Sequence, residues 1–389
     1  MNTETAYWMA LAHELPAWNF SNKNGWKNED KMNLIIQFYS NKKMLITDFF
    51  ELSERNLKED LQLNDNQIND LQKVKSTLAN YAFLAENLQN SGVEVIPVVS
   101  PEYSKILKKN LKTSAPLILY IKGNKHIMQE KSIAIVGSRD ASEVALKFTD
   151  NIAKLASKKY EVIVSGFAKG VDKQALDSAI ASKGQSIIVL PQGIMTFESG
   201  FKTYYKQIID GDVLALSTFH PKAGWGKELA MARNSIIYGL ANDIYVAESK
   251  PSRNRQGKET KGGTYAGVID GLNKGRKVYV RKPDVTEKND NNFFIIEKGA
   301  VAVDLNGFEL NKEQMIAFHS ENKSIEDKLK EILQKGWFPV NDILKKLESD
   351  WKPEKLTKEL NKFDFIVKKK EKNKNYFSLK GIVLQSTLF

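Results

Sequence analysis

Short apolar segments alternate with longer amphipathic segments between residues 131 and 282, and this alternation strongly constrains the fold. The segment "SIAIVG" precedes "ASEVALKFTDNIAKLASKK", and "EVIVSG" precedes "VDKQALDSAIASKG"; "SIIVLPQG", "DVLALST", "DIYVAES" and "KVYVRK" continue the series. Short apolar strands separated by helices are typical of parallel strands that are covered on both faces. The pattern therefore predicts an α/β fold with a doubly wound, mostly parallel sheet of Rossmann type.

The regions on either side of this alternation predict further domains. Residues 1–92 place apolar side chains at three- and four-residue spacing, which predicts a helical N-terminal domain. The Rossmann-like domain is predicted over residues 93–300, followed by a linker over 301–322. Residues 323–389 show three helical segments and two short strands joined by a charged turn, the pattern of a winged-helix domain.

The composition narrows the kinds of partner and site. Lys and Arg total 58 against 47 Asp and Glu, a formal net charge of +11. This excess favours a polyanionic partner, because each neutralised phosphate releases counterions; a Lys-rich solvated surface is the alternative. The sequence has no Cys and four scattered His, so no metal or cofactor is predicted. Neither a membrane span of about 18 apolar residues nor a secretory signal is evident, and a cytoplasmic protein is expected.

Two predicted strand-to-helix loops combine glycine with a cation. In "IAIVGSRDAS", Gly137 allows a tight turn before Ser138 and Arg139, and in "VIVSGFAKGVD", Gly166 and Gly170 bracket Lys169. Helix N-termini attract anions, and the carboxyl ends of parallel strands collect ligands. Neither loop has the glycine spacing of a dinucleotide site or a Walker A motif. The loops predict a phosphate-binding site at one edge of the sheet, while surface cations on ordinary turns are the alternative.

Several segments in this order resemble the DprA/Smf family of DNA-processing proteins. The segments are "IAIVGSRDAS", "VIVSGFAKGVD", "SIIVLPQGI", "MARNSIIYGLANDIYVAES" and "KGGTYAGVIDGLNKGRKVYV", with "GVEVIPVVSPEYSKILKKNLKTSAPLILYIKGN" upstream. The resemblance covers residues 93–282. It implies a protein that binds single-stranded DNA, forms a homodimer, helps to load a RecA-type recombinase in natural transformation or repair, and has no catalytic residues.

The resemblance also implies which residues contact DNA. The predicted DNA- or phosphate-binding residues are Gly137, Ser138, Arg139, Ser165, Gly166, Phe167, Lys169, Gly170, Arg233, Asn234, Gly263 and Thr264. Two basic segments are accessory candidates, with solvated surface as the alternative for each: Arg253, Arg255, Lys258 and Lys261 before the "GGT" turn, and Lys368, Lys369 and Lys370 in the charged turn of the tail.

Aromatic side chains in or near this site are candidates for stacking on bases. They are Phe167, Phe219, Trp225 and Tyr238. Core packing is expected for Tyr238, whereas both roles stay open for Phe167.

Two other functions remain open from the sequence. The first is a sensor, for example in phage defence, that binds a small nucleotide in the same pocket. The second is a phosphoribohydrolase-like enzyme, for which "KGGTYAGVID" has the Gly-Gly-Thr but lacks the preceding Pro and the following Glu of the cytokinin-activating enzymes.

Overall fold

Nine strands form one sheet in the computed structural model of the chain. The structure describes residues 3–17, 25–253, 259–284, 290–321, 325–347, 351–371 and 374–381. The chain divides into two compact units, Met1–Leu310 and Asn311–Phe389. The nine-stranded sheet lies in the first unit.

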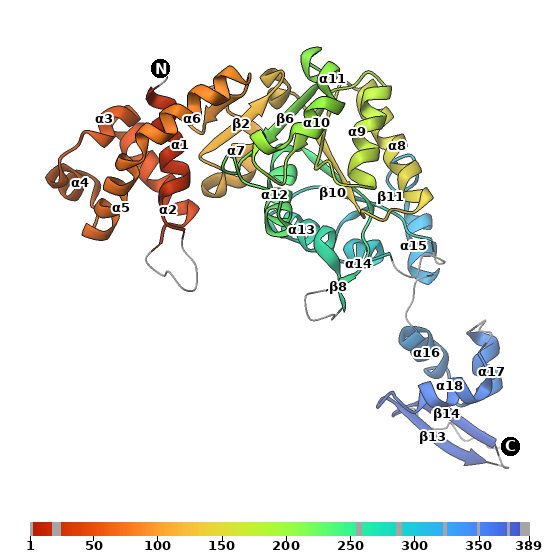
Figure 1. The fold of residues 1–389 in the computed structure, drawn as a ribbon. Coiled ribbons are helices and arrows are strands. Elements are labelled where there is room, and N and C mark those ends of the chain that lie inside the picture. Colours follow the sequence, from red (N-terminus) through yellow and green to blue (C-terminus); the bar gives the residue numbers. More distant parts are fainter. Residues whose placement is uncertain are drawn as a thin grey trace. The chain divides into compact units, whose positions relative to one another are not determined.

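The sheet is mostly parallel, as the alternation predicts (Figure 1). Its strands are β1 (Glu94–Pro97), β2 (Ile118–Lys122), β3 (Ser132–Gly137), β4 (Val162–Ser165), β5 (Ser186–Val189), β6 (Val213–Ser217), β7 (Asp243–Glu248), β10 (Val278–Arg281) and β11 (Val301–Val303). Their order in space is β1-β2-β6-β5-β4-β3-β7-β10-β11. Every neighbouring pair from β6 to β11 is parallel, whereas β2 pairs antiparallel with both β1 and β6.

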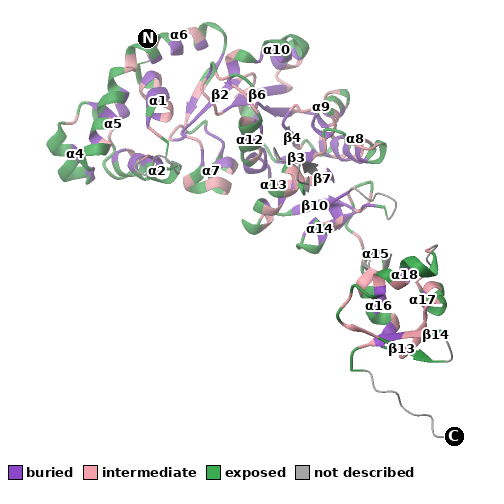
Figure 2. Ribbon diagram, turned by 60° about the horizontal axis from the view of Figure 1, so that its bottom comes forward, coloured by how far each residue is buried: buried purple, intermediate pink, exposed green. Residues whose placement is uncertain are grey.

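Helices cover both faces of the parallel part of the sheet. The helices α8 (Glu143–Lys158) and α9 (Val171–Ala181) pack on each other and on β3 and β4, whereas α12 (Lys227–Leu240) packs on β3, β4 and β5 and against α13 (Gly262–Asn273). Crossovers between parallel strands are right-handed, so the reversal of strand order between β6 and β7 puts α12 on the face opposite α8 and α9. The strands between these layers are almost entirely buried (Figure 2).

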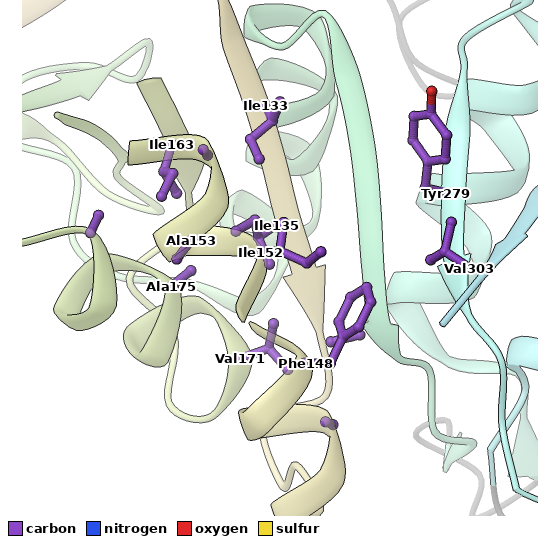
Figure 3. Packing of buried hydrophobic residues seen from close by; sticks show 14 residues of the cluster. Ile133, Ile135, Phe148, Ile152, Ala153, Ile163, Val171, Ala175, Tyr279 and Val303 are labelled. Atoms are coloured by element: carbon purple, nitrogen blue, oxygen red, sulfur yellow. The ribbon is translucent and has the colours of Figure 1, made fainter. Parts of the chain in front are cut away.

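A hydrophobic cluster joins α8 and α9 to the sheet (Figure 3). Ile133 and Ile135 of β3 meet Phe148 and Ile152 of α8, and Val171 of α9 completes the contact. These side chains recur every two residues on the strand and every four on the helix, the periodicities of a strand face and a helix face. The cluster fixes where β3 ends and α9 begins, and those two points frame the candidate site.

Helices make up most of the first 90 residues, as predicted. They are α1 (Thr3–Glu14), α2 (Asn28–Ile35), a π-helical turn (Ile36–Asn41), α3 (Ile46–Phe50), α4 (Glu54–Leu61), α5 (Asp65–Ser76) and α6 (Leu78–Asn90). Gly92 adopts a φ of 68° just beyond α6, a left-handed conformation that suits glycine after a helix.

A half-buried histidine joins these helices to the sheet. His13 of α1 shares a 2.8 Å hydrogen bond with the Tyr120 hydroxyl of β2, and its ring centroid lies 5.3 Å from that of His220. Burial, aided by the positive charges of His220 and Lys31, lowers the pKa of His13 to about 3. His13 is therefore neutral near pH 7, and ring packing and one hydrogen bond hold this contact.

Smaller elements complete the first unit. They are α7 (Lys105–Leu111), α10 (Glu198–Thr203), α11 (Tyr205–Ile209), α14 (Asn292–Glu297), three 3₁₀ turns (Lys112–Ser114, Lys125–Gln129 and Ile194–Thr196) and the paired strands β8 (Ser252–Arg253) and β9 (Glu259–Thr260).

The second unit has its own small core. Its elements are α15 (Lys312–Glu321), α16 (Ile325–Leu333), β12 (Phe338–Pro339), α17 (Val340–Lys346), α18 (Pro353–Leu360), β13 (Ile366–Glu371) and β14 (Lys374–Leu379). The three strands pair in the order β12-β14-β13. Leu329, Leu333, Ile343, Leu356 and Phe377 are buried together between these helices and strands.

The segment predicted as a linker over residues 301–322 contains a strand and a helix in its described part, and this prediction is corrected. Val301–Val303 forms β11, which pairs with β10 and extends the sheet beyond residue 300. Lys312–Glu321 then forms α15. A three-residue strand is too short to be told from a loop by its apolar pattern, because a strand signal needs at least four residues.

Among the helices of the described ranges, we find none whose length and apolar character would let it cross a membrane.

Candidate nucleic-acid interface

The two loops singled out in the sequence leave neighbouring strands at the same edge of the sheet. The strands β3 and β4 pair in parallel, with Ile133 opposite Ile163. Their carboxyl ends therefore meet at one edge, and the loops that follow Gly137 and Ser165 begin side by side. In doubly wound sheets this edge is where ligands collect.

The first loop turns sharply because Gly137 has no side chain. A Cβ on Gly137 would lie 2.6 Å from Cγ2 of Val171 and 3.0 Å from the carbonyl oxygen of Glu248. Ser138 follows, and its hydroxyl accepts a 3.1 Å hydrogen bond from the N–H of Asp140. The turn leaves Arg139 exposed at the edge of the sheet.

A buried carboxylate fixes the far end of this loop. The N–H of Ser142 donates to Oε2 of Glu248 over 3.1 Å, and Lys250 Nζ lies 3.4 Å from the same oxygen. Lys250 Nζ also donates to the carbonyl oxygen of Asp140 over 2.5 Å. Glu248 and Lys250 thus tie the loop to the end of β7.

Ser142 caps α8, and its replacement gives a modest stability prediction. Its hydroxyl accepts a 3.2 Å hydrogen bond from the N–H of Ala145. We expect Ser142→Ala to lower the free energy of unfolding by about 1 kcal/mol, the usual cost of losing a serine cap. Urea denaturation would measure this change. Ser53→Ala, which removes the corresponding cap of α4, serves as the control away from the site.

The second loop packs directly on the first. Gly170 has a φ of 83°, and a Cβ there would overlap the carbonyl oxygen of Ser138 and lie 2.6 Å from that of Arg139. The N–H of Val171 donates to the Ser138 carbonyl over 3.2 Å. Only glycine fits this approach, because the positive φ and the contact both exclude a side chain.

Arg139 and Lys169 are therefore brought to adjoining turns. Both side chains are exposed. Within the residues that the structure describes, no carboxylate lies within ion-pair distance of either cation. We call these two loops, residues 137–142 and 165–170, the cradle. It presents two positively charged side chains at the carboxyl edge of the sheet.

Arg233 lies beneath the cradle rather than at its surface. Its side chain is 4% exposed, and its Nη1 donates to the carbonyl oxygen of Val189 over 3.2 Å. Its Nη2 lies 3.7 Å from Oδ2 of Asp172. The guanidinium also presses against Gly166, where a Cβ would coincide with it. In this structure Arg233 thus supports the second loop from below.

Asp172 is the buried counter-ion in this arrangement. Burial raises the pKa of the Asp172 carboxyl, and the charge of Arg233 opposes that rise, as do hydrogen bonds from the N–H groups of Ala168 and Gly166. Asp172 lies in the first turn of α9, whose N-cap is Gly170. Asp172 is therefore the second residue of the helix and does not cap it.

Phe167 belongs to an aromatic group beside the cradle. Its φ is 59°, and its ring meets the rings of Phe197 and Tyr204 edge-on, with centroids 5.2 and 5.5 Å away. Phe197 and Tyr204 are buried, whereas Phe167 is half-buried. One part of the Phe167 ring thus packs and another part reaches solvent. Tyr238 is buried, as expected.

The remaining predicted residues fall in three places. Thr264 donates to the carbonyl oxygen of Gly137 over 3.3 Å, so the start of α13, with exposed Gly263, adjoins the first loop. Ser165 is buried and donates to the carbonyl oxygen of Ile135, and Asn234 is half-buried on α12.

The accessory basic residues are only partly placed. Lys261 Nζ lies over the rings of Tyr265 and Phe294, 4.8 and 4.1 Å from their centroids. Arg255 and Lys258 lie outside the described residues, as does the side chain of Arg253. Lys368, Lys369 and Lys370 lie on β13 in the second unit.

Comparison with known proteins identifies the family. A model of the family described as DNA recombination-mediator protein A matches residues 94–313, which is more than half of the chain. The chain belongs to this family. DNA processing protein DprA of Streptococcus pneumoniae is 35% identical over 136 residues, which are 35% of this chain and 48% of that protein. DprA of Bacillus subtilis is 29% identical over 195 residues, which are 49% of this chain and 61% of that protein.

The chain thus spans about half of the first of these two relatives and about three fifths of the second. The crystal structure of DprA from Streptococcus pneumoniae matches with a TM-score of 0.50 and 23% identity, covering 72% of this chain and 95% of that chain. This likeness supports the mixed α/β fold with its mostly parallel sheet.

Two features of the candidate site were not predicted from the sequence. The ion pair between Asp172 and Arg233 was not predicted, because the two residues are far apart in the chain and belong to different motifs. Arg233 was expected to contact DNA from its motif alone. A signal for its burial was present, since Ile236, Ile237 and Tyr238 follow it on the same apolar helix.

Proposed function

We propose that the cradle binds the phosphates of single-stranded DNA and that the protein acts as a DNA-processing recombination mediator. The observation that carries this proposal is the pair of exposed cations, Arg139 and Lys169, on two loops that touch at Gly170. An arginine fork and a lysine ammonium suit phosphate oxygens. Because the loops brace each other and Arg233 supports them, the cations need little rearrangement to meet a strand.

A single strand fits this edge better than a duplex. Single-strand binders combine a positive track for the backbone with aromatic side chains for the bases. The half-buried Phe167 lies in the same loop as Lys169 and provides such a ring.

Further parts of the proposal concern partners and the second unit. We propose that residues 323–389 form a winged-helix domain, with β13 and β14 as the wing. Membership of the recombination-mediator family supports a homodimer that delivers DNA to a RecA-type recombinase in the cytoplasm. We propose that the residues of the cradle bind DNA and do not catalyse a reaction.

Titration with oligo-dT at two salt concentrations tests the central proposal. We expect tight binding at low salt that weakens steeply as salt rises, because each neutralised phosphate releases counterions. Mononucleotides should compete poorly, since one phosphate engages only part of the cradle. Tight and nearly salt-independent binding of a mononucleotide would instead support a nucleotide sensor. Hydrolysis of a nucleoside monophosphate would support an enzyme.

The lysines of β13 give a smaller prediction. Lys368 and Lys370 are exposed, whereas Lys369 pairs with Glu371 and lies over the ring of Trp337. We expect Lys368→Ala with Lys370→Ala to weaken oligo-dT binding about threefold at low salt, since exposed charge contacts contribute little each. Fluorescence anisotropy would measure the change. Lys335→Ala with Lys345→Ala removes the same charge outside the hairpin, and an equal loss there would argue against the wing.

A further inference from the structure

An exposed tryptophan lies two strands along the sheet from the cradle. Trp225 is 59% exposed and precedes α12, in the loop that leaves the carboxyl end of β6. Its chain neighbours are Gly224 and Gly226, so neither carries a side chain that could cover the indole. From this placement we infer that Trp225 stacks on a base of the strand held by the cradle, an inference that rests on the proposed function.

The backbone before Trp225 is held firmly. The N–H of Gly193 donates to the carbonyl oxygen of Ala223 over 2.8 Å, and the Thr196 hydroxyl donates to the same oxygen over 3.0 Å. A Cβ on Gly193 would overlap the carbonyl oxygens of His220 and Pro221. The loop after β5 thus packs on the loop after β6. A ring that stacks on a base benefits from an ordered backbone, because it then loses little conformational freedom on binding.

The charges around Trp225 suit a nucleic-acid strand. Lys222 and Lys227 flank it in the sequence, and both are exposed. In the described part of the chain, neither side chain makes an ion pair. Glu228 carries one opposing charge, so the segment has two cations against one carboxylate. Proteins that bind single strands use exposed aromatic rings to stack on the bases and nearby cations to bind the phosphates.

The spacing suits one continuous strand. The strands β3, β4, β5 and β6 are consecutive in the sheet, so three inter-strand steps separate the loop of Arg139 from that of Trp225. At about 4.8 Å a step this is roughly 14 Å, a distance that a short oligonucleotide can span. A strand that lies along this edge can therefore meet Arg139, Phe167 and Trp225 in turn.

Length-dependent binding tests this role. We expect Trp225→Ala to weaken binding of an oligo-dT of about ten nucleotides roughly tenfold, the usual scale for one stacked base. Binding of an oligo-dT of about two nucleotides should be unchanged, because so short a strand occupies only the cradle. Trp225→Phe should keep most of the affinity but lose most of the quenching of tryptophan fluorescence by long oligo-dT.

A control variant and two contrary results separate the role of Trp225 from that of the cradle. Tyr160→Ala removes a ring that is 91% exposed in the turn before β4, at the opposite edge of the sheet, and should change nothing. Wild-type affinity of Trp225→Ala for the long oligo-dT, with full quenching in Trp225→Phe, would overturn the role of Trp225 and leave the cradle standing. Absence of binding by the wild-type protein at every length would overturn the cradle itself.

Discussion

Replacing Arg139 and Lys169 together with alanine is expected to weaken oligo-dT binding about 100-fold at low salt without unfolding the protein. Hydrogen bonds to charged groups contribute about 1.5–3 kcal/mol each, and two losses at the lower end of this range correspond to a factor of this size. The fold should survive because both side chains are exposed and make no ion pair within the described residues. Fluorescence anisotropy gives the affinity, and thermal unfolding followed by circular dichroism checks the fold.

The salt dependence of the double variant sharpens this test. For single strands, log Kd rises with log salt by about 0.7 for each phosphate neutralised. The double variant should therefore show a slope smaller by about 1.4. Lys158→Ala with Lys159→Ala removes the same charge where α8 ends, at the opposite edge of the sheet, and should leave both affinity and slope nearly unchanged. Equal losses in the two double variants would point to non-specific charge attraction instead of a cradle.

Gly166→Ala is expected to lower the free energy of unfolding by about 3 kcal/mol, the upper range for overpacking a filled core. The φ of Gly166 is not positive, so alanine is tolerated by the backbone itself. The cost arises because a methyl group would occupy the position of the Arg233 guanidinium. Arg233 would have to leave Asp172 and the Val189 carbonyl, and the second loop would lose its support.

A double-mutant cycle isolates this cause. Arg233→Ala alone should cost about 3 kcal/mol, because it leaves the Asp172 carboxylate buried without its guanidinium. In that background Gly166→Ala should cost less than about 0.5 kcal/mol, since the space is now empty. Urea denaturation of the four proteins measures the coupling. Additive losses would show that Gly166 is needed for a reason unrelated to Arg233.

The parallel sheet and the cradle could be predicted because their signals are local. Apolar runs such as Ile133 to Val136 have the composition of buried strands, and each glycine–cation loop follows its strand directly. The meeting of Arg139 and Lys169 then follows from topology alone, since the carboxyl ends of adjacent parallel strands share an edge.

The partners that hold the buried Arg233 could not be predicted from its motif, because they are remote in the sequence. Asp172 neutralises the guanidinium, Gly166 leaves space for it, and the Val189 carbonyl accepts its hydrogen bond. A charged side chain is buried only where such partners converge. The place of the antiparallel β1 and β2 in the main sheet also depends on tertiary pairing.

Photo-cross-linking of oligo-dT that carries 5-iodo-deoxyuridine tests the cradle most directly. Irradiation of the complex joins the base to aromatic side chains that it touches, and mass spectrometry locates the attached peptides. We expect cross-links at Phe167, which shares the second loop with Lys169, and their loss when Arg139 and Lys169 are alanine. Cross-links confined to other segments, unchanged in the double variant, would contradict the cradle as the binding site.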